Sequence, residues 1–293
     1  MAMILRCWWL TFAGLAALLA VAAASAARAS LSEYLIQRIQ EAHKAESNKQ
    51  FELALRIYQQ AIDKELASGG NIRALLKQRA ALYEQLSVLD KAEADLTAIF
   101  NIKPFDPQSL VDRGYFYLRR NRFADALGDF LAASRYDRKN PRYLYGAGRV
   151  LVAARDFVNA VNFYSEAIKL GPGDATLYLA RAEAYVNLKM MSEAGADYEK
   201  ALALGLKERT DRFFAFAGRG YVRLQAGNYD GAIRDLDRAL GFDPDALNAR
   251  LWRAHAYEMA GEPDLAQRDY ERALTIMPDS IPARQGIQRL RAQ

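Results

Sequence analysis

The sequence has little of the chemistry that catalysis and metal binding need. In 293 residues there is one cysteine, Cys7, and there are two histidines, His43 and His255. Because Cys7 lies in an N-terminal segment typical of an export signal, the remaining chain has no thiol. This excludes disulfides, cysteine-ligated zinc, iron–sulfur clusters and thiol catalysis there. With 40 Lys and Arg against 35 Asp and Glu and no long basic block, nucleic-acid binding also lacks support.

Sequence motifs of common enzyme sites are absent too. The chain contains no GxxxxGK[ST], HExxH or GxSxG pattern. Gly146-Ala147-Gly148 looks like the start of a dinucleotide loop, but the third glycine and a preceding strand are missing, so close helix packing is the simpler interpretation. We therefore expect no enzyme activity, no cofactor and no metal site.

The N-terminus has the pattern of an export signal. Arg6 precedes an uncharged stretch, residues 7–27, which ends in small residues with two Ala-x-Ala-like cleavage candidates near Ala26 and Ala29. Residues 1–29 are predicted to be a signal peptide or, alternatively, an uncleaved membrane anchor, since about 20 apolar residues suffice to span a bilayer. Membrane contact is then expected only through residues 7–27. Either alternative places the rest of the chain in the periplasm or outside the cell.

The rest of the chain is an internal repeat. Anchor alanines recur at spacings of 34 or 38 residues, with a small residue twelve positions before each anchor and a ring or leucine four positions after it. The anchors are Ala54, Ala92, Ala126, Ala160, Ala194, Ala232 and Ala266. Positions 0, +4 and +7 share one helical face, so each copy predicts two amphipathic helices that must stack on neighbouring copies to bury their apolar sides.

These residues resemble the tetratricopeptide repeat family, most clearly in residues 178–205, 218–244 and 251–278. The predicted fold is therefore an all-α right-handed solenoid of about seven helix-turn-helix repeats in residues 30–278, followed by a C-terminal capping helix in residues 279–293. The repeats are placed at about 35–72, 73–106, 107–140, 141–174, 175–212, 213–246 and 247–280. Extra residues near Ser68 and Lys207 account for the two longer spacings and lengthen a helix or a loop.

An arginine and an aspartate occur together in five of the seven copies. The arginine stands thirteen residues before the anchor and the aspartate three after it, in the pairs Arg79 and Asp95, Arg113 and Asp129, Arg181 and Asp197, Arg219 and Asp235, and Arg253 and Asp269. Joint presence within one chain predicts contact. We interpret each pair as an ion pair between the two helices of one repeat, in preference to a charge ladder for a ligand.

The resemblance implies a binding groove, because the first helices of successive repeats line the concave side of such solenoids. The candidate partner-binding residues are Tyr115, Arg119, Arg142, Tyr145, Arg149, Glu183, Phe214 and Tyr221. Tyrosine and arginine are enriched at binding hot spots, and arginines suit a peptide carboxylate. Glu46, Glu84 and Glu258 would make the ends of the groove acidic. The alternative binding surfaces are the convex side and the charged cap, for example Arg284, Arg289 and Arg291.

We thus expect a non-enzymatic scaffold or adaptor of the cell envelope that binds a partner protein or peptide in its concave groove. The alternative is an accessory subunit of an envelope polysaccharide-export or outer-membrane assembly machine. Fold alone does not decide between them.

Overall fold

The computed structural model describes residues 33–104 and 106–292, and these form helices and short connections without a strand. The predicted signal segment, residues 1–29, lies outside the described residues. The first helix spans residues 33–47. It is followed by α2 (Phe51–Ala67), α3 (Arg73–Gln85) and α4 (Leu89–Ile102). These four helices belong to one compact unit, and the residues from Asp106 onward form a second.

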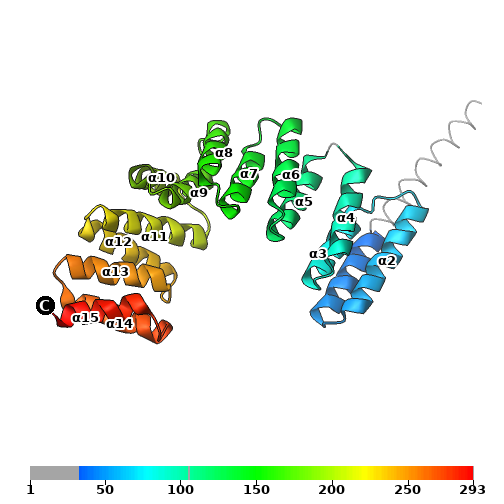
Figure 1. Cartoon of the computed structure of the whole chain (residues 1–293). Coiled ribbons are helices and arrows are strands. Elements are labelled where there is room, and N and C mark those ends of the chain that lie inside the picture. Colours follow the sequence, from blue (N-terminus) through cyan, green and yellow to red (C-terminus); the bar gives the residue numbers. More distant parts are fainter. Residues whose placement is uncertain (1–32, 105, 293) are drawn as a thin grey trace, which may run out of the picture. The chain divides into compact units, whose positions relative to one another are not determined.

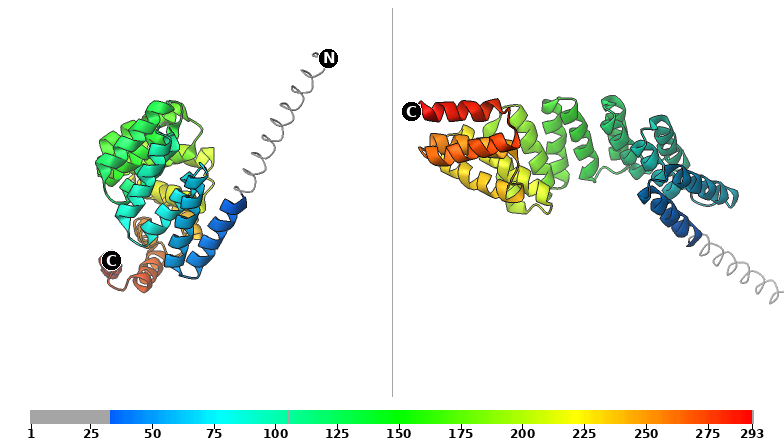
Figure 2. Two further views of the ribbon diagram at one scale, coloured as in Figure 1. Left: turned by 90° about the vertical axis from the view of Figure 1, so that its right-hand side faces the viewer. Right: turned by 90° about the horizontal axis from the view of Figure 1, so that it is seen from below.

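The second unit contains five helical hairpins and a final helix. The hairpins are α5 (Pro107–Arg119) with α6 (Phe123–Tyr136), α7 (Pro141–Ala153) with α8 (Phe157–Leu170), α9 (Ala175–Asn187) with α10 (Met191–Leu204), α11 (Arg209–Gln225) with α12 (Tyr229–Phe242), and α13 (Leu247–Met259) with α14 (Pro263–Ile276). Helix α15 (Ile281–Arg291) packs on α14. Each hairpin packs on the next in chain order (Figures 1 and 2). The predicted all-α repeat fold is confirmed.

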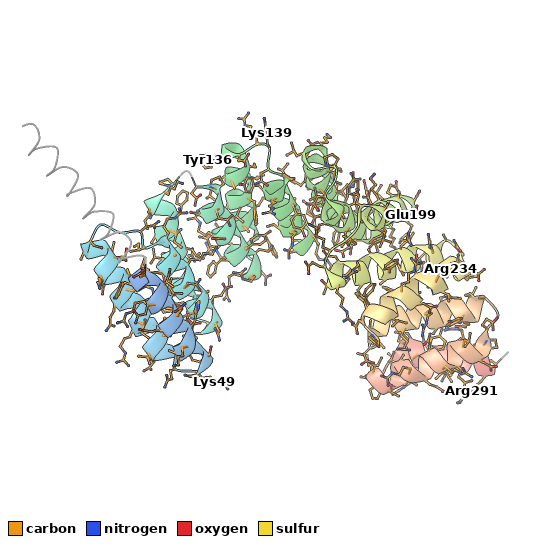
Figure 3. All side chains as sticks on the ribbon, turned by 180° about the vertical axis from the view of Figure 1, so that it is seen from behind. Lys49, Tyr136, Lys139, Glu199, Arg234 and Arg291 are labelled. Atoms are coloured by element: carbon orange, nitrogen blue, oxygen red, sulfur yellow. The ribbon has the colours of Figure 1, made fainter. Side chains whose placement is uncertain are left out.

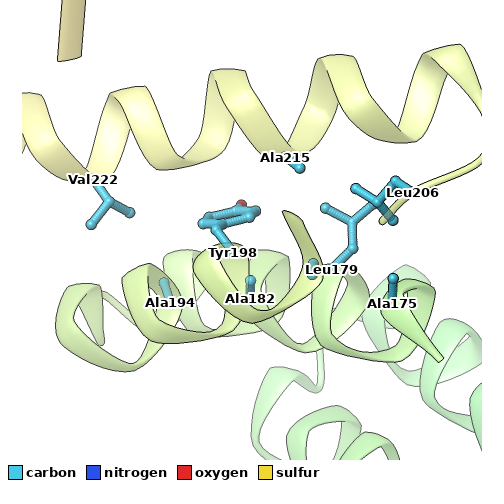
Figure 4. Close-up of a cluster of buried hydrophobic side chains, with 9 residues drawn as sticks. Ala175, Leu179, Ala182, Ala194, Tyr198, Leu206, Ala215 and Val222 are labelled. Atoms are coloured by element: carbon cyan, nitrogen blue, oxygen red, sulfur yellow. The ribbon is translucent and has the colours of Figure 1, made fainter. Parts of the chain in front are cut away.

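The anchor alanines form the centre of each hairpin. All seven are fully buried, so a larger side chain there would need space that the close-packed hairpin does not leave. The ring or leucine four residues later fills the space between successive hairpins. Tyr198, for example, lies between the α9–α10 hairpin and α11, with Ala182 and Ala194 on one side and Ala215 on the other (Figure 4).

These rings pack against glycines at two positions of the repeat, twelve and fourteen residues before the anchor. A Cβ atom at Gly148 would lie 2.4 Å from the Tyr164 ring, and one at Gly146 would lie 2.3 Å from the Phe130 ring of the preceding hairpin. Gly218 meets Tyr198 and Gly286 meets Tyr270 in the same way as Gly146 meets Phe130. The Gly-Ala-Gly stretch therefore serves close helix packing, as the sequence indicated.

The turn between the two helices of each repeat has one conformation throughout. The residue five positions before each anchor has a positive φ, between 58° and 81°. The seven residues are Lys49, Ser87, Asn121, Arg155, Lys189, Gly227 and Gly261. This left-handed residue ends the first helix, and the next amide closes the turn by donating to the carbonyl five residues earlier, as Asn228 N donates to Arg223 O at 2.9 Å. Only two of the seven positions are glycine, so composition did not reveal the turn.

The five arginine–aspartate pairs are present as predicted. In each, the arginine Nε and Nη2 donate to the two carboxylate oxygens of the aspartate at 2.7–2.8 Å. The aspartates are buried. In three repeats the third guanidinium nitrogen also reaches the second helix of the preceding repeat, through Gln59, Ser165 or Asp237. These arginines thus join three helices, which the sequence correlation did not indicate.

The extra residues of the two longer repeats mostly lengthen helices. Helices α2 and α11 have 17 residues each, whereas the other numbered helices of the hairpins have 13 or 14. In α11 the added turn places Arg209 against the end of α12, where it donates to the Phe242 carbonyl oxygen. No helix of the described part of the chain is long and apolar enough to cross a membrane.

Candidate partner-binding face

The inner face of the second unit is the side formed by the first helices of its hairpins, α5, α7, α9, α11 and α13. Consecutive first helices pack directly against one another, whereas consecutive second helices make no comparable contacts. Helices that crowd together on one side and diverge on the other give that unit a concave side made of first helices. Second-helix residues such as Glu199 and Arg234 are exposed on its outer side (Figure 3).

A hollow of about 440 Å³, here called the arginine hollow, lies across α5, α7 and the start of α9. It contains three of the predicted residues, Tyr115, Arg142 and Tyr145. Its other lining residues are Gln108, Val111, Asn140, Tyr143, Asp174, Thr176 and Leu177. Three of these polar side chains are already engaged, because Asn140 and Asp174 cap the helices that follow them and Gln108 donates to Asp112 Oδ1 at 2.9 Å. Arg142 is exposed and has no ion pair among the described residues, so its guanidinium is available to a ligand.

Arg149 lies beside the arginine hollow between two rings. Its guanidinium carbon is 5.7 Å from the centre of the Tyr115 ring and 6.0 Å from that of Tyr145, which are cation–π distances. Tyr115 contacts the buried Phe130 edge-on, at 5.0 Å between ring centres, and Tyr145 packs on the buried Tyr164 at 5.9 Å. The two tyrosines therefore belong partly to the core, and they position an exposed arginine that makes no ion pair of its own within the described ranges.

A second, mostly apolar hollow of about 560 Å³ lies across α9, α11 and α13. We call it the aromatic hollow. It contains the remaining inner-face candidates Glu183, Phe214 and Tyr221. It is completed by Val186, Tyr198, Phe213, Ala217, Gly218, Ala246, Leu247, Asn248, Ala249, Trp252 and Met277. Phe214 is 51% exposed, and the rings of Tyr221 and Trp252 lie 4.8 Å apart.

Sequence reasoning missed Trp252, Phe213 and Met277. The predicted groove positions stand 18, 15, 11, 8 and 7 residues before each anchor, whereas Trp252 stands 14 residues before Ala266. The available signal was composition: Trp252 stands where three other copies have Ala or Gly (Ala180, Gly146 and Gly218). A tryptophan at a position that is small in these three copies indicates a local change in packing.

Two carboxylates lie together on the inner face. Glu183, on α9, lines the aromatic hollow with part of its side chain open to solvent and the rest enclosed by helices, and Asp211 lies one turn before Phe214 on α11. Desolvation by the surrounding helices and the nearby charge of Asp211 raise the pKa of Glu183 to about 7, and Arg149 partly offsets this. The pKa of Asp211 is also raised, by burial and by Glu208. No cation of the described ranges lies within ion-pair distance of either carboxylate.

Arg119 and the predicted end acids differ from the other candidates. Arg119 is exposed at the end of α5 and lines neither hollow. Glu46 and Glu258 accept hydrogen bonds from the buried tyrosines of their own hairpins, at 2.8 Å from Tyr58 and 2.7 Å from Tyr270. Two of the three acids expected at the groove ends, Glu46 and Glu258, therefore form hydrogen bonds inside their own hairpins.

Two of the three arginines named for the charged cap form hydrogen bonds within the fold. Arg289 of α15 donates to both carboxylate oxygens of Glu258, at 2.6 and 2.8 Å. This pairing lowers the pKa of Glu258 to about 2. Arg284 donates to the carbonyl oxygen of Pro278. Nowhere in residues 33–104 or 106–292 do three or more potential metal-ligating side chains gather.

Comparisons with known proteins agree with this architecture. Models described as tetratricopeptide repeats match residues 111–175, 175–204 and 218–281, more than half of the chain. The chain belongs to the tetratricopeptide repeat family. Proteins of this family act as protein–protein interaction scaffolds, and their repeats are typically non-catalytic.

Individual relatives match only in part. Dynein axonemal assembly factor 4 of Pongo pygmaeus is 35% identical over 112 residues, which are 37% of this chain and 27% of that protein. This chain therefore spans about a quarter of that relative's length. Among solved structures, pilF of Pseudomonas aeruginosa has a TM-score of 0.63 at 16% identity, covering 74% of this chain and 97% of that one. YrrB, a repeat protein with an unusual peptide-binding site, has a TM-score of 0.56 at 20% identity, covering 66% and 97%.

Proposed function

We propose that this protein is an exported, non-enzymatic scaffold of the cell envelope that holds a partner protein or peptide on the inner face of residues 106–292. The family supports the scaffold class, and the signal-like N-terminal sequence supports export. The observation that carries the binding face is the combination of two hollows with arginines, Arg142 and Arg149, that have no ion pair in the described chain. A peptide is also the ligand class of YrrB, which shares the fold.

The two hollows supply different kinds of contact. The arginine hollow offers a guanidinium among tyrosines, which suits a carboxylate or a main-chain carbonyl. The aromatic hollow offers exposed Phe214 and the edge of the Tyr221–Trp252 pair, which suit apolar side chains. An extended partner segment crossing from α7 to α11 would contact both. Arg119 lies outside both hollows and is therefore given no direct role.

The binding face is tested by charge reversal. Arg142→Glu combined with Arg149→Glu is expected to abolish capture of the partner from envelope extracts, since both side chains are exposed and their loss leaves the core intact. Arg149→Ala alone should weaken binding by about 1–3 kcal/mol, the range of a hot-spot residue. Tyr145→Ala should weaken binding by a similar amount. Because Tyr145 packs on Tyr164, the melting temperature of that variant must be measured alongside.

Arg234→Glu is the matched control, because it makes the same charge change on the outer side of α12. The groove assignment fails if the double arginine variant captures the partner normally while truncation after Pro278 abolishes capture without unfolding the hairpins.

The proposed location is tested separately. The protein is fused at its C-terminus to alkaline phosphatase, which is active only outside the cytoplasm, and the mature N-terminus is sequenced. A start near residue 27 or 30 is expected for a cleaved signal, and an intact membrane-bound chain for an anchor. An inactive fusion in the cytoplasmic fraction would refute export.

A further inference from the structure

The aromatic hollow has apolar surface that its own side chains do not cover. Phe214 is 51% exposed and Met277 45% exposed, although both lie beside the half-buried Tyr221–Trp252 pair. Exposed large apolar groups that cluster in a concavity are typical of binding sites. The hollow, at about 560 Å³, falls in the size range of ligand sites, roughly 300–1,000 Å³. It accommodates one or two bulky side chains of a partner.

The charged residue that lines this hollow and the one beside it are both acidic, and Arg149 of α7 only partly offsets them. Glu183 lines it and Asp211 lies one helical turn from Phe214, and neither carboxylate has a cation within ion-pair distance in the described chain. Burial raises the pKa of Glu183, and repulsion by the nearby Asp211 raises it further. A cation placed between them would relieve this repulsion. The cations of the inner face lie on the neighbouring helix α7, at Arg142 and Arg149, next to the other hollow.

We propose that the aromatic hollow binds a partner segment in which a bulky aromatic or aliphatic side chain has a lysine or arginine within three residues. The apolar side chain contacts Phe214, Tyr221 and Trp252, and the cation pairs with Glu183 and Asp211. This inference rests on the proposed function, since it names the partner chemistry at part of the same face.

Charge distinguishes this occupant from others that an apolar hollow could bind. A fatty acid or an anionic lipid would bring a negative charge beside two carboxylates that form no ion pair within the described residues, and an acidic peptide would do the same. A second copy of this chain would need an exposed apolar side chain beside a free cation. Phe214, which has Asp211 on its own helix face, does not offer that combination, so two copies would not pair hollow to hollow.

Peptide selection tests the inference. The full chain is used to select from a phage-displayed library of random 12-residue peptides. We expect enrichment, by at least about tenfold over the unselected library, of sequences with Trp, Phe, Tyr, Leu or Met within three residues of Lys or Arg. Phe214→Ser should abolish this enrichment. Glu183→Lys combined with Asp211→Lys should change the preferred partner residue from basic to acidic, whereas Glu193→Lys, an exposed residue of α10, should leave it unchanged.

The outcomes separate the inference from the proposed function. Peptides that depend on Arg142 and Arg149 but carry acidic residues, or that keep their basic residues on the double lysine variant, overturn the inference and leave the scaffold function standing. If no enriched peptide depends on Phe214 or on the two arginines, both the inference and the proposed function are overturned. Phe214-dependent dimerisation in sedimentation, or Phe214-dependent flotation with phosphatidylglycerol vesicles, assigns the hollow to a second copy or to lipid and also overturns the inference.

Discussion

At the scale of single residues, the best-defined interaction is the arginine–aspartate pair inside five repeats. The pair is bidentate and mostly buried, so removing one partner leaves a charge without compensation. The fourth repeat shows that the fold does not require it, because Ala147 and Phe163 occupy the same two positions. Packing two apolar groups there is an alternative that this chain already uses.

Arg181→Ala is therefore expected to lower the free energy of unfolding by about 2–4 kcal/mol, because Asp197 stays buried without its partner. Arg181→Ala combined with Asp197→Phe, which copies the fourth repeat, should recover most of that loss. Urea unfolding of the two variants and the wild type measures the difference. If the double variant is less stable than Arg181→Ala, the aspartate does more than neutralise the arginine.

Glu183 should make stability depend on pH near neutrality. Its pKa is raised to about 7 in the folded state, so the folded protein binds the proton more tightly than the unfolded chain. The resulting stability is present at low pH and is lost as the pH rises through 7. Glu183→Gln should thus raise the melting temperature at pH 8 and leave it nearly unchanged at pH 5. Because the side chain is exposed and screened, we expect an effect below about 1 kcal/mol. An equal shift at both pH values would refute the assignment.

At the scale of elements, the contact between hairpins depends on rings that lie against glycines. Each such ring occupies the space that a side chain of the facing residue would fill if that residue were larger than glycine. The ring and the glycine are therefore packed as one unit. In the α11–α12 hairpin, Leu236 stands at the position that holds a ring in most other repeats. Trp252 of α13 faces it, and the aromatic hollow lies beside this pair. The candidate site therefore depends on this reversal, in which the smaller side chain lies on the second helix and the ring lies on the next first helix.

Gly146→Ala is expected to cost about 1–3 kcal/mol, because its Cβ would lie 2.3 Å from the Phe130 ring and force it to move. Gly128→Ala is the matched control. Gly128 lies in α6, and a Cβ atom added there would meet open space, so alanine should stabilise that helix by about 0.5–1 kcal/mol. Thermal unfolding of both variants provides the test, and equal effects would show that the contact with Phe130 carries no cost.

At the scale of the whole molecule, contacts in the described residues run between helices that are one or two apart in chain order. Stability in such an array is close to a sum of hairpin terms and nearest-neighbour terms. Helix α15 ends the array of residues 106–292 by covering Tyr270 with Gly286 and by pairing Arg289 with Glu258. It leaves a polar, basic outer side, as a terminal helix needs for solubility.

Deletion of residues 279–293 should therefore destabilise the last hairpin first. Amide hydrogen exchange in α13 and α14 is expected to accelerate by more than about tenfold, while α5–α8 change little, because neighbouring terms alone couple them. Arg289→Ala should give a smaller acceleration in the same two helices. A uniform increase from α5 to α14 would show that the five hairpins unfold as one cooperative unit.

The sequence alone determined the repeat, the helix pairs and the arginine–aspartate contacts. Each follows from spacing within one repeat, and a regular backbone converts spacing into position: residues that recur at 0, +4 and +7 share a helix face wherever the hairpin lies. The candidate face was predicted as one groove of first-helix residues. In the structure Tyr115, Arg142 and Tyr145 line one hollow and Glu183, Phe214 and Tyr221 line another, and their role in binding stays a prediction.

Only the tertiary structure decided how that face is divided and which of its groups are available. The hollows arise from contacts between repeats, where the size of one ring determines what the next helix can place opposite it, so Trp252 joins the site from an unexpected offset. Glu46, Glu258 and Arg289 are drawn into hydrogen bonds by buried tyrosines. Such pairing depends on which side chains meet across three helices, and a single-repeat pattern carries no information about a neighbour's side chains. For that reason the two carboxylates beside the aromatic hollow emerged as a site only in three dimensions.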